Sequence, residues 1–191
     1  KEIPVGNNFT LGEVAAPLTT VTTPQRLILE VSVNNRKNDW NIWVYPTVRQ
    51  AIPHENKICM TDRLDTITLN TLEKGATVLL SLKKGSLSKK LGGDIQIGFS
   101  SIFWNTAWTA KQAPHTLGIL CNPAHPALSE FPTEYHSDYQ WWDAMSHSGA
   151  IEFSKLSPKI HPIVRVIDDW FTNRPLALLF EARVGKGKIL V

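Results

Sequence analysis

The stretch that decides the fold, Lys57–Leu82, reads KICMTDRLDTITLNTLEKGATVLLSL. Its first five residues form a short apolar run that predicts a strand, and Asp62 is a suitable N-cap for a helix over Arg63–Lys74. Gly75 stands where a helix C-cap glycine belongs, and the continuous apolar run Ala76–Leu82 predicts a strand buried on both faces. A strand, a helix and a strand in so short a segment predict a βαβ unit, whose two strands are parallel.

Further apolar runs follow this unit towards the C-terminus. They predict strands at His115–Cys121, Ile160–Asp168, Leu176–Val184 and Lys188–Val191, the last two as a hairpin around Gly185–Gly187. Ile160–Asp168 has the length of a helix, but its Ile-Val-Arg-Val-Ile composition favours a strand. Tyr135–Met145 predicts a short helix, and Lys83–Ala113 is a long, glycine-containing loop of a kind that is often functional. The main body is therefore expected to be α/β, with a largely parallel central sheet.

The first 46 residues have a different pattern. Arg26–Val33 is rich in β-branched residues and partly alternating, Asn34–Asp39 is a polar turn signal, and Trp40–Tyr45 alternates again. Together with Phe9–Leu18, these segments predict two or three antiparallel strands, too few to be stable alone. We therefore expect them to pack on the following domain or to belong to an adjoining β-sandwich.

Composition excludes several classes of protein. The 191 residues carry 20 Lys and Arg against 17 Asp and Glu, and a net charge of +3 is too small to predict a nucleic-acid binder. Composition also excludes a membrane span and a disulfide scaffold. Cys59 and Cys121 both lie in apolar runs, which predicts buried free thiols, although a disulfide between them stays open. The histidines are scattered without ligand spacing, so we predict no metal site and no cofactor.

The most informative feature is the concentration of aromatic residues in two segments, Phe99–Trp108 and Phe131–Trp142. Both segments are rich in loop-forming residues. Tryptophan faces stack on the apolar C–H faces of sugar rings, and neighbouring polar side chains can bond the hydroxyls. We therefore predict carbohydrate stacking by Trp104, Trp108, Trp141 and Trp142, with hydrogen bonds from Asn105, Glu134, His136 and Asp143. The alternative is that these aromatic residues close a core beneath long loops.

No catalytic residue is predicted. A nucleophile elbow needs small residues on both sides of the nucleophile. The glycine before Cys121 is one position too far away and none follows it, and Ser100 also lacks the second glycine. His125 and Glu134 could serve as partners, but no spacing ties them to either nucleophile.

Asp39–Pro46 resembles the strand that closes a β-sandwich domain in large bacterial glycoside hydrolase family 2 (β-galactosidase-like) proteins. Four further runs are similar to a domain that follows that sandwich: Phe103–Trp108, Leu117–Leu128, Phe131–Trp142 and Phe180–Lys188. The resemblance implies a C-terminal accessory region with a flavodoxin-like or amidotransferase-like α/β fold that lacks the amidotransferase nucleophile. On this basis residues 1–50 are expected to be remnant β-sandwich strands and linker, and residues 51–191 the α/β domain.

The resemblance also implies a function. The catalytic glutamates of such glycosidases lie on a separate barrel domain, which needs about 250 residues and so cannot be contained in this chain. We therefore expect a non-catalytic accessory domain that acts in polysaccharide breakdown by packing on the substrate cleft or extending it. Its partners would be the other domains of the parent glycosidase and an oligosaccharide, and the resemblance implies export to the periplasm or cell surface. Two alternatives stay open: a free-standing Cys or Ser hydrolase or amidotransferase-like enzyme, and an oligomerisation module.

Overall fold

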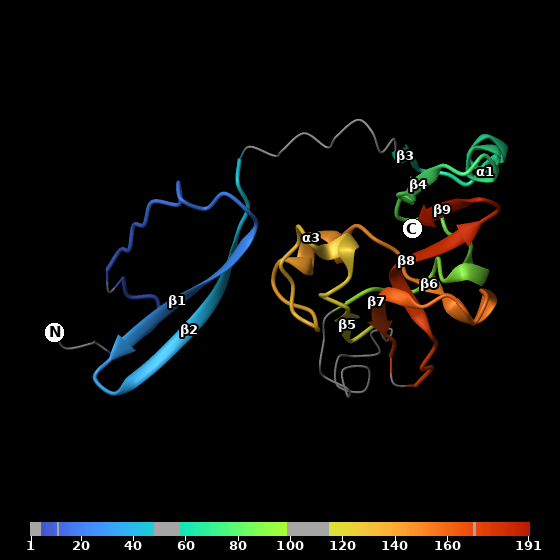
Figure 1. Cartoon of the computed structure of the whole chain (residues 1–191). Helices are drawn as coiled ribbons and strands as arrows, with labels where there is room; N and C mark the ends of the chain where they lie inside the picture. Colours follow the sequence, from blue (N-terminus) through green and yellow to red (C-terminus); the bar gives the residue numbers. More distant parts are fainter. Residues whose placement is uncertain (1–4, 11, 48–57, 99–114, 170) are drawn as a thin grey trace. The chain divides into compact units, whose positions relative to one another are not determined.

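The computed structural model describes residues 5–10, 12–47, 58–98, 115–169 and 171–191. The chain divides into two compact units, Lys1–Arg49 and Gln50–Val191 (Figure 1). Strands account for 33% of the described residues and helices for 14%. The chain is therefore built mainly from sheet.

The first unit contains one antiparallel hairpin, made by β1 (Gln25–Val33) and β2 (Arg36–Val44). Val33 pairs with Arg36, so the turn is only two residues long, and Asn34 in it has a φ of 54°. Asparagine tolerates this left-handed conformation, and such a turn matches the natural twist of two strands. The predicted turn Asn34–Asp39 was therefore too long, and the described residues of Phe9–Leu18 contain no strand.

The second unit contains a mixed sheet. Its strand order is β3-β4-β9-β8-β7-β5, with β6 pairing to β8 (Figure 1). The strands are β3 (Ile58–Thr61), β4 (Thr77–Leu80), β5 (Gly118–Cys121), β6 (Ile151–Glu152), β7 (Pro162–Ile167), β8 (Leu176–Val184) and β9 (Gly187–Leu190). Among these strands only the pairs β3–β4 and β4–β9 are parallel, whereas β5–β7, β6–β8, β7–β8 and β8–β9 are antiparallel.

The prediction of a flavodoxin-like or amidotransferase-like α/β fold with a largely parallel sheet is therefore wrong. The βαβ unit itself is confirmed, because α1 (Thr66–Glu73) connects the parallel strands β3 and β4. The error was to expect the other strands of the sheet to be parallel as well. The tight turn between β8 and β9 forces an antiparallel pair, and β5 runs antiparallel to β7 with Cys121 opposite Val164. An apolar run indicates a buried strand but does not determine its direction.

The start of α1 differs from the prediction. Its N-cap is Asp65, whose carboxylate accepts a 2.9 Å hydrogen bond from the backbone N–H of Thr68. Asp62, the predicted N-cap, instead pairs with the ammonium of Lys83 at 2.8 Å and with the guanidinium of Arg63 at 3.1 Å. These contacts, chiefly the hydrogen bond from Lys83, lower the pKa of the Asp62 carboxyl to about 2.

Two clusters of buried side chains form the core of the second unit. The smaller lies between α1 and the parallel strands and consists of Leu72, Val78, Leu80 and Ile189. The larger packs α3 (Trp141–Ser146) against the antiparallel strands and includes Ile119, Cys121, Trp141, Met145, Val164 and Leu176. Short 3₁₀ turns occur at η1 (Lys89–Leu91), η2 (Pro126–Leu128) and η3 (Phe153–Lys155). The antiparallel half of the sheet therefore carries most of the buried apolar side chains.

Candidate functional site

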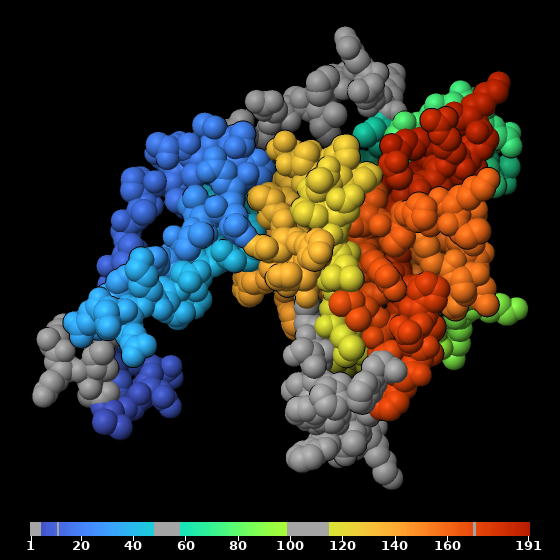
Figure 2. All heavy atoms as spheres, turned by 60° about the horizontal axis from the view of Figure 1, so that its bottom comes forward, coloured from blue at the N-terminus to red at the C-terminus, as the bar shows by residue number. Residues whose placement is uncertain are grey.

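Residues 131–147, here called the aromatic segment, follow the edge of the sheet and then form α3. The backbone N–H of Cys121 donates a 2.8 Å hydrogen bond to the carbonyl of Tyr135, and Leu120 bridges His136 in antiparallel fashion. This pairing places His136 in a β-bridge rather than in a helix, so the helix is shorter than the predicted Tyr135–Met145. The segment lies at the surface of the second unit, in yellow and light orange in Figure 2.

Trp141 belongs to the core. Its side chain is only 7% exposed, and its indole Nε1 donates a 2.7 Å hydrogen bond to the hydroxyl of Thr133. Its ring packs edge-to-face against Phe131, with 4.8 Å between the ring centroids and 75° between the planes. This ring is therefore used for packing and does not offer a face on which a sugar could stack.

Three other rings of the aromatic segment are open to solvent. Tyr135 is 62% exposed, Tyr139 85% and Trp142 63%. The backbone N–H of Trp142 donates to the carbonyl of Tyr139 at 3.2 Å, which places these two residues three positions apart on one turn and hence on the same side of it. We call Tyr139 and Trp142 the aromatic face. Tyr135 and Tyr139 were not among the predicted ligand residues, although the spacing of Tyr139 and Trp142 in the sequence already indicated a shared side.

The polar candidates of the aromatic segment lie at its surface. The side chain of Asp143 is 92% exposed, and its carboxylate lies 3.4 Å from Nδ1 of His147. His136 is exposed, with Nδ1 3.1 Å from the carbonyl of Ser137, and Glu134 is half-buried. The other three candidates, Trp104, Asn105 and Trp108, lie outside the described residues. Of the eight predicted ligand residues, the aromatic segment therefore presents Glu134, His136, Trp142 and Asp143 at its surface.

The sequence around the aromatic face is acidic. No lysine or arginine occurs between Lys111 and Lys155 in the sequence. The same stretch contains the carboxylates of Glu130, Glu134, Asp138, Asp143 and Glu152. The folded chain brings one ammonium to this stretch, that of Lys84, which lies 2.6 Å from the carbonyl of Ser146.

Neither cysteine has the environment of a nucleophile. Both are free; Cys59 is exposed, contrary to the prediction, and Cys121 is buried. Burial raises the pKa of the Cys121 thiol to about 11, against a smaller lowering by its hydrogen bond with Thr133. His125, the predicted partner, uses Nδ1 to accept a 3.2 Å hydrogen bond from the backbone of Ala127. Ser100 lies outside the described residues.

The buried Asp168 and Asp169 form an ionic cluster with the half-buried Arg174 after β7. Arg174 donates to both carboxylate oxygens of Asp168, from Nε at 2.8 Å and from Nη2 at 2.9 Å, and its backbone N–H adds a bond of 2.7 Å. Burial alone would raise the pKa of Asp168, but these hydrogen bonds outweigh it and the pKa is lowered. Asp169 accepts from the backbone N–H groups of Phe171 and Thr172. Both carboxylates are committed to holding the loop after β7.

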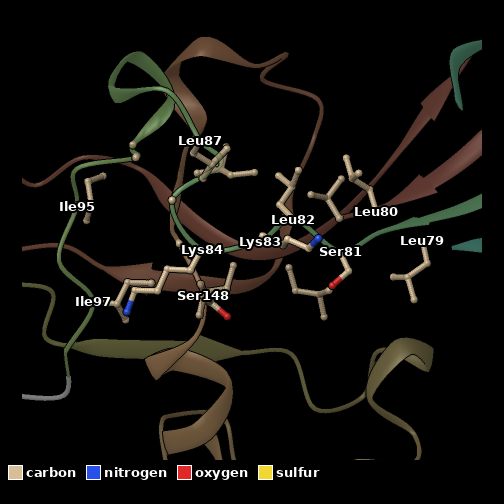
Figure 3. A pocket seen from close by; sticks show the side chains of 18 of the residues that line it. Leu79, Leu80, Ser81, Leu82, Lys83, Lys84, Leu87, Ile95, Ile97 and Ser148 are labelled. Carbon is tan, nitrogen blue, oxygen red and sulfur yellow. The ribbon is translucent and has the colours of Figure 1, made fainter. Parts of the chain in front are cut away.

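A cavity of about 430 Å³, here called the β4 pocket, opens where β4 ends (Figure 3). Its apolar side chains include Leu79, Leu82, Leu87, Ile95 and Ile97. Ser81, Lys83, Lys84 and Ser148 add polar groups (Figure 3). Ligands of open sheets commonly bind at the carboxyl ends of parallel strands, which is where this pocket lies.

Comparison with protein families divides the chain in the same region as its two compact units. Residues 59–191 match the domain of unknown function DUF8487, which covers more than half of the chain. The chain belongs to the DUF8487 family. Residues 1–46 match a second domain of unknown function, DUF8488. No curated protein matches the chain.

In this DUF8487 protein, the described residues contain no group of three or more His, Cys, Asp or Glu side chains that could hold a metal ion. The part of the chain that the structure describes also has no helix of the length and apolarity needed to cross a membrane. Two features of the described surface are considered below as ligand sites, the aromatic face and the β4 pocket.

Proposed function

We propose that this DUF8487 protein is a non-catalytic accessory domain of a glycosidase, which contacts a neutral oligosaccharide through its aromatic face. The observation that carries the proposal is the exposure of Tyr139 and Trp142 on one side of the same turn, at 85% and 63%. Exposed aromatic rings grouped together commonly mark an interaction site, and their faces suit the C–H faces of pyranose rings.

The environment of Trp142 supports a binding role better than a packing role. Its neighbour Trp141 takes the core position, with its hydrogen bond to Thr133, so Trp142 points away from the core at the start of α3. The carboxylate of Asp143 and the imidazole of His147 lie one turn apart on the same helix and contact each other at 3.4 Å. They can exchange hydrogen bonds with sugar hydroxyls without first losing buried partners.

The state of the candidate nucleophile supports a non-catalytic role. A thiol nucleophile acts as thiolate and is usually activated by a lowered pKa. Burial has the opposite effect on Cys121, whose pKa is raised to about 11. The imidazole of His125 lies in a backbone cap rather than beside a thiol. Glycoside cleavage would accordingly be carried out by other domains of the parent protein, and export to the periplasm or cell surface forms part of the same proposal.

The exposed carboxylate of Asp143 favours neutral sugars over uronic acids. An anionic sugar on the aromatic face would lie close to the exposed carboxylate of Asp143, four positions after Tyr139. Like charges at an exposed site repel each other by roughly 0.2–1 kcal/mol per pair, and salt weakens this repulsion. Neutral galactosides and xylosides are therefore expected to bind more tightly than pectic oligosaccharides.

The test is calorimetric titration of the whole chain with neutral galacto- and xylo-oligosaccharides and with pectic oligosaccharides. Trp142→Ala should abolish the binding heat, whereas Phe171→Ala, which removes an aromatic ring that is 65% exposed outside the aromatic segment, should preserve it. The absence of heat with every sugar would refute the proposal. Equal loss in both variants would assign the effect to general damage and also refute it.

Light scattering distinguishes the oligomerisation alternative. An accessory domain that binds glycan is expected to be a monomer at the concentrations used for titration. If the chain forms a dimer or trimer that Trp142→Ala dissociates, the aromatic face is a subunit interface and the glycan proposal fails.

A further inference from the structure

The β4 pocket has the size and construction of a small-molecule site. Its volume of about 430 Å³ falls within the range of typical ligand pockets, roughly 300–1,000 Å³. Its walls come from the end of β4, the loop that follows, residues 92–97 and the start of the segment after α3. Figure 3 shows Leu87 above the cavity, Ile95 and Ile97 at its side and Ser148 below it. The lining joins these apolar side chains to polar groups from Ser81, Lys83, Lys84, Gln96 and Ser148, and a ligand pocket uses both kinds.

Two glycines fix the wall that follows η1. A Cβ atom on Gly92 would lie 2.4 Å from the carbonyl oxygen of Ala150, and one on Gly93 would lie 2.0 Å from that of Leu87. Gly92 also has a φ of 102°, which side chains other than glycine rarely adopt. The backbone at Gly92 and Gly93 is thus closely packed against Ala150 and Leu87, which leaves this wall of the pocket little room to move.

The charge at the pocket comes from lysines alone. The described residues that line it include Lys83 and Lys84 but no Asp or Glu. The ammonium of Lys83 pairs with the carboxylate of Asp62 at 2.8 Å. The ammonium of Lys84 instead donates a 2.6 Å hydrogen bond to the neutral carbonyl of Ser146, near the C-terminal end of α3. Lys84 therefore brings a positive charge to the pocket that no carboxylate in its described contacts balances.

We propose that the β4 pocket binds a small monocarboxylate with an apolar body, whose carboxylate pairs with Lys84. The apolar body would lie against the leucine and isoleucine side chains. An ammonium group has three donors, and the bond to Ser146 uses one of them, so Lys84 can hold the helix end and the ligand at once. Neither Tyr139 nor Trp142 lines the pocket, so this inference does not rest on the glycan contact, although Lys84 joins the pocket to the end of α3.

The test uses octanoate as the probe, with octanol and octylammonium as matched probes of similar length. Binding to the full chain is measured by calorimetry and by chemical-shift changes of the residues that line the pocket. Octanoate should bind more tightly than octanol, and octylammonium should bind most weakly. Lys84→Gln should weaken octanoate about five-fold and leave octanol unchanged.

Lys83→Gln is the matched control, since it removes a neighbouring lysine whose ammonium already pairs with the carboxylate of Asp62. It should change the dissociation constant of octanoate less than about two-fold, because a weak exposed ion pair contributes no more than that to binding. If octanoate and octanol bind equally, or if the two variants have equal effects, the assignment to Lys84 fails. If no probe shifts the pocket resonances, the proposal of a ligand site fails altogether.

Discussion

The indole nitrogen of Trp141 donates a 2.7 Å hydrogen bond to the hydroxyl of Thr133, eight residues earlier in the chain. This bond closes the aromatic segment on itself and orients the indole into the larger core cluster. The neighbouring Trp142 is then directed to solvent, because adjacent residues of a helix face different sides. Two identical side chains, adjacent in sequence, thus have different roles.

Unfolding experiments should separate these two tryptophans. Trp141→Ala should lower the free energy of unfolding by about 3–5 kcal/mol, because it leaves a large cavity in the core. Trp142→Ala should change that free energy by less than about 0.5 kcal/mol, as expected of an exposed side chain. Urea titration followed by circular dichroism measures both. Similar losses of stability in the two variants would show that Trp142 is a packing residue and would weaken the proposed glycan contact.

The two cysteines should differ in reactivity. Cys59 is exposed, whereas Cys121 is buried with its pKa raised to about 11, so little thiolate forms at Cys121 near neutral pH. At pH 7.5 we expect an alkylating probe to label one thiol rapidly and the other only in denaturant. Cys59→Ser should remove the fast phase and leave the slow one. Fast labelling of Cys121 in that variant would reopen the alternative of a cysteine hydrolase.

The contact between Asp168 and Arg174 should make stability depend on acid pH. The lowered pKa of Asp168 means that its contribution is fully present above the ordinary value of 3.8 and is lost as the pH falls through the lowered pKa. Arg174→Met should destabilise the second unit by about 2–4 kcal/mol near neutral pH, because it leaves a buried carboxylate without its cation.

Urea titrations between pH 2 and pH 7 test this linkage. In Arg174→Met the fall in stability below pH 4 should be smaller than in the parent chain, since the carboxyl then no longer has its strongest partner. An unchanged pH profile would show that other carboxylates dominate the acid response. Lys155→Met, at a lysine of η3 that is exposed at the surface, serves as the control and should leave the profile intact.

Much of the local structure was predictable from particular residues. The apolar runs before Asp62 and after Gly75 correctly predicted the strands of the βαβ unit. The turn Gly185–Gly187 correctly predicted the hairpin of β8 and β9. The composition of Ile160–Asp168 correctly favoured a strand over a helix. In each case the deciding interaction is local, because turn chemistry and side-chain branching act within a few residues.

The arrangement of the sheet was not predictable in the same way. The direction of β5 depends on its pairing with β7, more than forty positions away, and nothing within Gly118–Cys121 encodes it. The same holds for the site, where the burial of Trp141 depends on Thr133 and Phe131 and the charge at the β4 pocket depends on Asp62 and Ser146. These contacts join distant segments. The sequence pattern therefore identified candidate site residues but could not show which of them are buried and which are exposed.

The glycines of the β4 pocket allow a test of its rigid wall. Gly93→Ala would place a Cβ atom 2.0 Å from the carbonyl oxygen of Leu87, so the backbone must shift. We expect it to lower the melting temperature by several degrees, an effect of roughly 1–3 kcal/mol for overpacking. Gly149→Ala, in the same pocket, meets only the Leu87 side chain at 3.4 Å and should be nearly neutral. A neutral Gly93→Ala variant would show that this wall is not closely packed.

The start of α1 provides the last test, because two aspartates compete for the role of N-cap. Asp65 accepts hydrogen bonds from both the backbone N–H and the hydroxyl of Thr68, and these bonds lower the pKa of its carboxyl. Asp62, three residues earlier, has its carboxylate occupied by Lys83 and Arg63. Asp65→Ala should therefore reduce the urea midpoint clearly more than Asp62→Ala, and Asp65→Asn should retain most of the stability because asparagine also caps helices.

Since the pKa of Asp65 is lowered on folding, its contribution is present above pH 3.8 and is lost as the pH falls through the lowered value. The reverse order, with Asp62→Ala the more damaging, would place the helix start at Arg63, where sequence pattern alone predicts it.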